Sequence, residues 1–245
     1  MQNLEKPVHA RGLLPVWSEE SLTGDPNAGR YDAFVNAERL RETLPNSKIF
    51  VTIREQKALA RSHYAECLHS GGTIRTKGYF GTGSESLSMT PKLRHEYLQY
   101  DRLVQHYVNS FGAENVLVLP QELLRSSPVY YFDKLSDFLD LDPLTNLAST
   151  EIHGSLSARG LYVGRILNHL FTPDPLSFGG NPWQRKVFDG ILRRLDRLVP
   201  KALDFGAERN LKNYVNIRYQ GAFAASNAKL AALTGLDLAE LGYEL

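Results

Sequence analysis

The sequence predicts an α/β fold of the three-layer type, in which helices cover both faces of a parallel sheet and a helical C-terminal half follows. Short apolar runs at residues 13–17, 49–53 and 115–119 are typical of buried strands, and the second and third are rich in Val and Ile. Helical patterns separate these runs. Strands that alternate with helices indicate a mostly parallel sheet covered on both faces.

The helices of the first half are predicted from apolar residues at three- and four-residue spacing. They cover residues 32–44, 57–68 and 93–111, and Pro45 and Gly112 are placed to end the first and the third. Beyond Pro128 only helical patterns follow. One is marked by Tyr131, Leu135 and Phe138, and others cover residues 161–171, 183–199 and 219–233.

Two segments between these patterns read as loops. Residues 171–182 are rich in Pro and Gly. Residues 70–91 form a longer stretch of Gly, Ser and Thr with few apolar positions, and loops of that length are usually functional or mobile. This second loop is therefore a candidate substrate lid.

Composition limits the classes of function. A chain of 245 residues suits one domain, residues 1–245, with a substantial core. A formal net charge of +1 argues against binding nucleic acid or an anionic membrane over the whole surface, and leaves room for one local basic pocket. Cys67 is the single cysteine and the seven histidines lack HExxH-type spacing, so we predict no intrachain disulfide and no metal site.

The sequence also bears on location. No run approaches the roughly 18 apolar residues of a membrane span, and residues 1–14 lack the apolar core of a signal peptide. Together with the single cysteine, this pattern predicts a cytoplasmic protein.

The strongest chemical candidate is the segment KIFVTIREQKALARSHY, residues 48–64. A buried strand ends at Arg54, and the helix after the turn carries Ser62 in its first two turns. In an open α/β sheet, ligands bind at the carboxyl ends of strands and near helix N-termini. A guanidinium there can bind a phosphate with two hydrogen bonds, and a hydroxyl can add a third. The alternative is a surface salt bridge of Arg54 and an exposed helical serine.

A second candidate is Glu20, which follows the apolar run at residues 13–17. Strand periodicity would place Ser18 and Glu20 on one side and Glu19 on the other. In a partly desolvated pocket, Glu20 can act as the general base that removes a proton from an acceptor hydroxyl. The alternative is a helix N-cap or a solvated acidic turn.

These motifs resemble those of sulfotransferases that use 3′-phosphoadenosine 5′-phosphosulfate. The family binds the 3′-phosphate of this cosubstrate with an Arg and a Ser at the spacing of Arg54 and Ser62. The stretch at residues 100–142 is similar to the family's helix–strand–helix block, with Glu122 and Pro128 in place, although Asp140 departs from the usual glycine. Residues 218–243 resemble the ending of a bacterial subfamily.

The resemblance implies a P-loop-like sulfotransferase domain that transfers a sulfonate group from 3′-phosphoadenosine 5′-phosphosulfate to a hydroxyl of a carbohydrate or lipid. Arg54 and Ser62 would bind the 3′-phosphate, and Glu20, within a Ser-x-Glu motif, would be the base on the acceptor side. The partners implied are a small-molecule or glycan acceptor, with no nucleic acid, and the chemistry needs no metal.

One part of the family's pattern is absent. Sulfotransferases stabilise the transferred group with a P-loop-like loop of Lys, Gly and Thr after the first strand. Nothing before Leu13 can form that strand and loop, and neither Gly-x-x-x-x-Gly-Lys nor Lys-x-Gly-Thr-Thr occurs in the sequence. We therefore expect the first strand to be missing and the chain to be truncated at its N-terminus.

The absent loop leaves two other classes of protein open. The chain can be a short protein of the same fold that binds a nucleotide or a partner without catalysis. A kinase that uses a nucleoside triphosphate is less favoured, because it needs the same Lys-bearing loop and a metal-binding acid.

Overall fold

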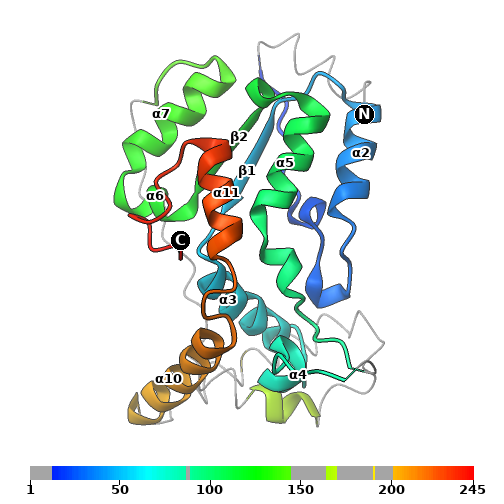
Figure 1. The fold of residues 1–245 in the computed structure, drawn as a ribbon, viewed down its shortest axis with the longest axis vertical. Helices are drawn as coiled ribbons and strands as arrows, with labels where there is room; N and C mark the ends of the chain where they lie inside the picture. Colours follow the sequence, from blue (N-terminus) through cyan, green and yellow to red (C-terminus); the bar gives the residue numbers. More distant parts are fainter. Residues whose placement is uncertain (1–12, 87–88, 145–163, 170–189, 191–200) are drawn as a thin grey trace.

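The computed structural model describes residues 13–86, 89–144, 164–169, 190 and 201–245, and helices dominate this part of the chain (Figure 1). Two strands, β1 (Ile49–Ile53) and β2 (Val116–Pro120), pair in parallel. Ile49 is paired with Val116 at one end and Ile53 with Pro120 at the other. The strands predicted at residues 49–53 and 115–119 are confirmed to within one residue.

The predicted three-layer parallel sheet is wrong. Across the described ranges the sheet has two strands, and residues 13–17 form neither strand nor helix. Pro15 has no N–H to donate to a strand ladder, and Val16 is 73% exposed. The run is apolar but it is not buried, so its composition misled the strand prediction. The protein is instead mostly helical, with a small parallel sheet.

The first two predicted helices are confirmed. α2 (Ala33–Thr43) corresponds to the helix predicted at residues 32–44, and α3 (Gln56–His69) to the one at residues 57–68. Glu55 begins α3 as its N-cap, because its carboxylate accepts hydrogen bonds from the N–H groups of Lys57 (2.8 Å) and Ala58 (2.7 Å).

The third predicted helix is shorter than expected. α5 (Tyr100–Phe111) is preceded by a separate 3₁₀-helix, η3 (His95–Leu98), where the sequence pattern predicted one continuous helix over residues 93–111. Gly112 ends α5 as predicted. Its φ of 88° lies in the region that favours glycine.

The C-terminal half is helical where the structure describes it. Residues 164–169 are helical, whereas the rest of the predicted elements at 161–171, 171–182 and 183–199 falls outside the described residues, apart from Gly190. The helix predicted at residues 219–233 begins later, because a turn with Gly221 at a φ of 67° precedes it. The remaining elements are η1 (Glu20–Thr23), η2 (Pro26–Ala28), η4 (Ala113–Asn115), α6 (Gln121–Ser126), α7 (Pro128–Leu139), α10 (Lys201–Arg218) and α11 (Ala224–Thr234). None of the described helices combines the length and the apolar character needed to cross a bilayer.

The loop predicted at residues 70–91 contains a short helix, α4 (Thr76–Phe80). Two donors from α10 bind the end of this helix: the Tyr214 hydroxyl donates to the Gly81 carbonyl (2.8 Å), and Arg218 Nε donates to the Phe80 carbonyl (3.1 Å). Phe80 is fully buried. The middle of the segment is therefore part of the core, in contrast to the predicted lid.

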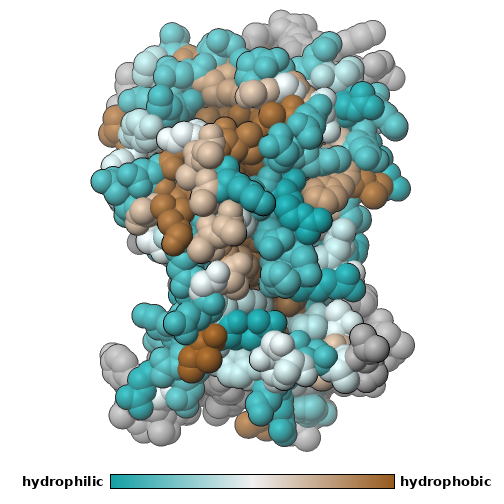
Figure 2. Space-filling view, in the orientation of Figure 1, coloured by the Kyte–Doolittle hydropathy of each residue, from teal (hydrophilic) through white to brown (hydrophobic). Residues whose placement is uncertain are grey.

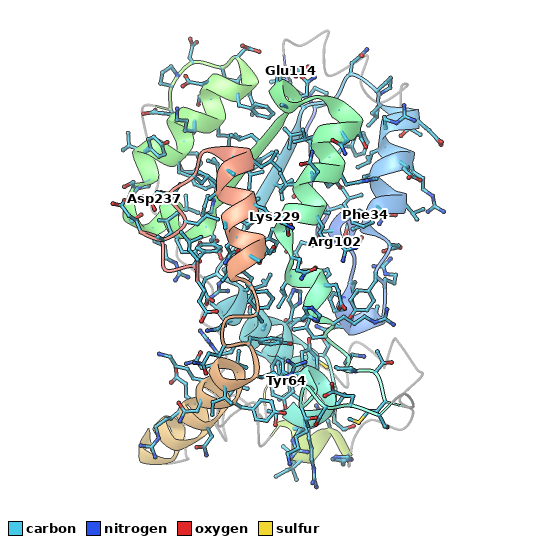
Figure 3. All side chains as sticks on the ribbon, viewed as in Figure 1. Phe34, Tyr64, Arg102, Glu114, Lys229 and Asp237 are labelled. Atoms are coloured by element: carbon cyan, nitrogen blue, oxygen red, sulfur yellow. The ribbon has the colours of Figure 1, made fainter. Side chains whose placement is uncertain are left out.

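Among the described residues, two apolar clusters form the core, and α3 connects them. The upper cluster in Figure 1 packs the sheet against α5, α2 and α11, and the lower one packs α3 against α4 and α10. Tyr64, labelled in Figure 3, lies in the lower cluster and is 1% exposed. Leu59 of α3 packs against both clusters.

A buried polar pair links α3 to α11. Gln56 and Asn227 are 1% and 0% exposed, and their side-chain amides exchange hydrogen bonds. Asn227 Nδ2 also donates to the Glu244 carbonyl (2.8 Å). The amides thus find partners inside the core, as buried polar groups must. The exposed side of α11 carries Ala225, Ala228 and Ala232 beside Lys229, and Figure 2 shows tan and brown residues in this region.

Truncation of a core leucine tests this packing. Leu230 of α11 is fully buried against the sheet cluster. We expect Leu230→Ala to lower the free energy of unfolding by about 2–5 kcal/mol, because it removes buried methyl groups and leaves a cavity. Urea denaturation measures the change. The control is Ile217→Ala in α10, whose side chain is 77% exposed and should lose less than about 0.5 kcal/mol. Equal losses in both variants would contradict this core.

Candidate functional site

A large groove runs along β1. All five residues of β1 lie in its walls, whereas no residue of β2 does. Its volume is about 2190 Å³, which exceeds the roughly 300–1,000 Å³ of most small-ligand pockets. We call it the β1 groove. It has room for an extended ligand, and its lining includes the three residues that the sequence singled out, Glu20, Arg54 and Ser62.

Arg54 lies at the carboxyl end of β1, as predicted. The Tyr100 hydroxyl donates a hydrogen bond to the Arg54 carbonyl (2.7 Å) and so anchors the backbone there. The Arg54 side chain is partly buried, and its guanidinium makes no hydrogen bond or ion pair with another described residue. Within that part of the chain the alternative of a surface salt bridge is therefore not seen.

Two carboxylates belong to this region. Glu55 follows Arg54 in the chain and Glu122 lies just beyond the end of β2, and both accept hydrogen bonds from other groups. Glu55 accepts from the first N–H groups of α3. Glu122, just beyond β2, accepts from the Glu55 N–H (2.9 Å) and from the Tyr243 hydroxyl (3.0 Å). Burial lowers the pKa of the Arg61 guanidinium, and the like charge of Arg54 adds a smaller effect in the same direction, while Glu55 opposes both. The Arg54 guanidinium therefore lines the groove without a carboxylate partner among the described residues, although Glu55 and Glu122 nearby keep their negative charge.

Ser62 lies on the side of α3 that faces the β1 groove. The groove-lining residues of this helix are Leu59, Ser62, His63, Glu66 and Ser70. Their spacing of three or four residues places them in one stripe along the helix. Ser62 is exposed, so its hydroxyl is accessible from the groove. The structure thus brings Arg54 and Ser62 to a shared surface.

Glu20 also lines the groove, but not in the way predicted. It is the first residue of η1 rather than the end of a strand, and its side chain is exposed. Glu19 caps η1 by accepting a hydrogen bond from the Ser21 N–H (3.1 Å), which holds the pKa of the Glu19 carboxyl below its usual range. A general base works best where water is partly excluded, and the exposed position of Glu20 does not provide this.

Exposed aromatic side chains form part of the groove wall. Trp17 is 47% exposed and Phe34 is 40% exposed. Phe34, labelled on α2 in Figure 3, contacts the ring of His106 with 4.7 Å between the centroids. This wall offers apolar surface to a bound molecule.

The residues that flank the Arg54–Ser62 motif have structural partners. Lys57 forms an ion pair with Glu244 and does not line the groove, and the Tyr64 hydroxyl donates to the Ile74 carbonyl (3.1 Å) inside the core. His63 lines the groove, half-buried against Tyr97 with 5.6 Å between the ring centroids.

The residues of the family-like ending also serve packing. The Ser226 hydroxyl donates to Asp101 of α5, and Asn227 belongs to the buried amide pair. Glu122, a residue of the family-like block, accepts hydrogen bonds from a backbone N–H and from a tyrosine hydroxyl. Tyr100 was missed altogether, since its place in an apolar pattern suggested only a core role. In the described ranges no group of three His, Cys, Asp or Glu side chains is placed to hold a metal ion.

Comparisons of the chain with models of protein families, with curated proteins and with solved structures found no match.

The burial of His63 makes the free energy of unfolding depend on pH. Burial lowers the pKa of His63 below its ordinary value of 6.5, while Asp25 and Glu66 act weakly in the opposite direction. The unfolded chain therefore binds a proton more readily than the folded protein, and stability falls as the pH drops below about 6.5. We expect His63→Gln to reduce the loss of unfolding free energy between pH 7.5 and 5.5, as measured by urea denaturation. His95→Gln, at a side chain that is 43% exposed, is the control. The same pH slope in the wild type and His63→Gln would contradict the prediction.

Proposed function

We propose that the β1 groove binds the 3′-phosphate end of 3′-phosphoadenosine 5′-phosphosulfate, with Arg54 and Ser62 as its ligands, in a domain of the sulfotransferase type. The observation that carries the proposal is the guanidinium of Arg54, which has no partner among the described residues and lines the same groove as the Ser62 hydroxyl. A phosphate between them would receive two charge-assisted hydrogen bonds from the guanidinium and one from the hydroxyl.

The local electrostatics support an anionic ligand at this place. Glu55 and Glu122 accept hydrogen bonds from N–H and O–H groups, and neither is paired with the Arg54 guanidinium. The N–H donors of this guanidinium are therefore available to a phosphate. Because Arg54 is partly buried, its attraction to the phosphate is screened less than on an open surface.

The acceptor occupies the other part of the groove in this proposal. The exposed faces of Trp17 and Phe34 suit the apolar face of a sugar or the chain of a lipid. Glu20 takes the proton of the acceptor hydroxyl in this scheme. The Glu20 carboxylate is exposed in the free protein. Its proton affinity rises when the bound acceptor displaces water from the groove.

A second candidate is binding of the same nucleotide without transfer. Transfer requires cations that stabilise the charge developing on the sulfonate and the leaving phosphate. The printed sequence contains no Lys-bearing glycine loop of the kind that supplies them, and this observation favours the second candidate.

Adenosine 3′,5′-bisphosphate tests both candidates. We expect it to raise the melting temperature saturably, and we expect adenosine 5′-monophosphate, which lacks the 3′-phosphate, to do so much more weakly. Arg54→Ala should raise the Kd about tenfold or more, because it removes a charge-assisted pair of hydrogen bonds. Ser62→Ala should have a smaller effect. Arg54→Lys, which retains the charge but not the paired geometry, should lie between the wild type and Arg54→Ala.

The control is Arg41→Ala, an exposed arginine of α2 that does not line the groove and should leave the Kd unchanged. Equal affinity for the two nucleotides, or an unchanged Kd in Arg54→Ala, would reject the phosphate site. Transfer of radiolabelled sulfonate to a hydroxyl acceptor then separates the first candidate from the second.

A further inference from the structure

The peptide group that joins Arg54 to Glu55 is held at both of its polar atoms. The Tyr100 hydroxyl donates to its carbonyl oxygen (2.7 Å), and Glu122 Oε1 accepts from its N–H (2.9 Å). Strand pairing ends at Ile53 and α3 begins at Gln56, so this peptide has no partner within the strand pair or the helix. Side chains from α5 and α6 satisfy it instead.

Glu122 is in turn fixed by the C-terminal segment. Its second oxygen accepts from the Tyr243 hydroxyl (3.0 Å), and Tyr243 is 4% exposed. Burial, together with the nearby Glu122 charge, raises the pKa of the Tyr243 phenol, so the hydroxyl keeps its proton and continues to donate.

Neighbouring contacts hold Tyr243 in place. Glu244 forms an ion pair with Lys57 and accepts from the Gly221 N–H (3.1 Å), and its carbonyl accepts from Asn227 Nδ2 (2.8 Å). The Glu244 side chain therefore binds the C-terminal segment to the first turn of α3, and the Glu244 carbonyl binds it to α11.

We propose that Glu122 is a positioning residue, which acts together with Tyr243 to set the direction in which Arg54 enters the β1 groove. The peptide plane after Arg54 determines the ψ angle of that residue. Fixing both ends of the plane therefore restricts the range of directions open to the Arg54 side chain. A side chain that starts from a fixed backbone loses less conformational freedom when its guanidinium binds a phosphate. The role rests on the proposed function of Arg54 in anion binding.

The inference is tested with Glu122→Gln and Tyr243→Phe. The first substitution keeps the size of the side chain, but the single oxygen of the new amide would have to serve both donors. The second keeps the ring and removes only the hydroxyl. We expect both variants to accelerate hydrogen exchange of the Glu55 amide about tenfold, and to raise the Kd for adenosine 3′,5′-bisphosphate about fivefold through the loss of one hydrogen bond.

The matched control is Tyr214→Phe, which removes another partly buried hydroxyl, bound to the Gly81 carbonyl and remote from the groove walls. It should leave both readouts unchanged. A double variant distinguishes the positioning role from a general loss of stability. In the Arg54→Ala background, Tyr243→Phe should weaken nucleotide binding no further, because its effect runs through Arg54.

The outcomes separate the positioning role from the function. If Arg54→Ala loses binding while Glu122→Gln and Tyr243→Phe bind like the wild type, the positioning role is overturned and the phosphate site stands. If the wild type does not bind the bisphosphate, the proposed function is overturned, and with it the ligand that Arg54 is positioned for. If hydrogen exchange of the Glu55 amide is unchanged in both variants, Glu122 and Tyr243 do not fix this peptide group, and the positioning role is overturned.

Discussion

The parallel pairing of β1 with β2 is the interaction on which the rest of the structure depends. Two strands alone form a sheet of marginal stability in water, so the pair must be covered by helices. α5 supplies much of this cover through Val104, Tyr107 and Phe111. The same pairing brings the ends of β1 and β2 together, which places the peptide group between Arg54 and Glu55 within hydrogen-bonding distance of Glu122. The strand pairing that forms the sheet therefore also positions the residues of the candidate site.

The sequence could predict the elements whose local signals agree with their environment. β1 and β2 are short apolar runs rich in β-branched residues, and both are buried in part. The run at residues 13–17 is equally apolar, but it contains Pro15, and Val16 is highly exposed. Composition alone therefore does not distinguish a buried run from one that lines a groove. The predicted three-layer sheet counted that run as a strand and was wrong, although the two observed strands do pair in parallel.

The candidate site was predictable in part. A strand that ends in arginine and a helix with a serine seven residues beyond its N-cap place Arg54 and Ser62 on one surface through local geometry alone. The role of Glu122 could not be found in this way. Its two hydrogen bonds reach Glu55, 67 residues away, and Tyr243, 121 residues away. Contacts of that separation depend on how helices pack, which a single sequence does not encode in any short pattern.

The binding of α4 by α10 has a consequence for the order of folding. A helix of five residues has too few internal hydrogen bonds to persist alone. Its last carbonyls are satisfied by Arg218 and Tyr214, which follow them by 138 and 133 residues. Closing loops of that length is slow compared with forming local helices. α4 therefore becomes ordered only when α10 docks.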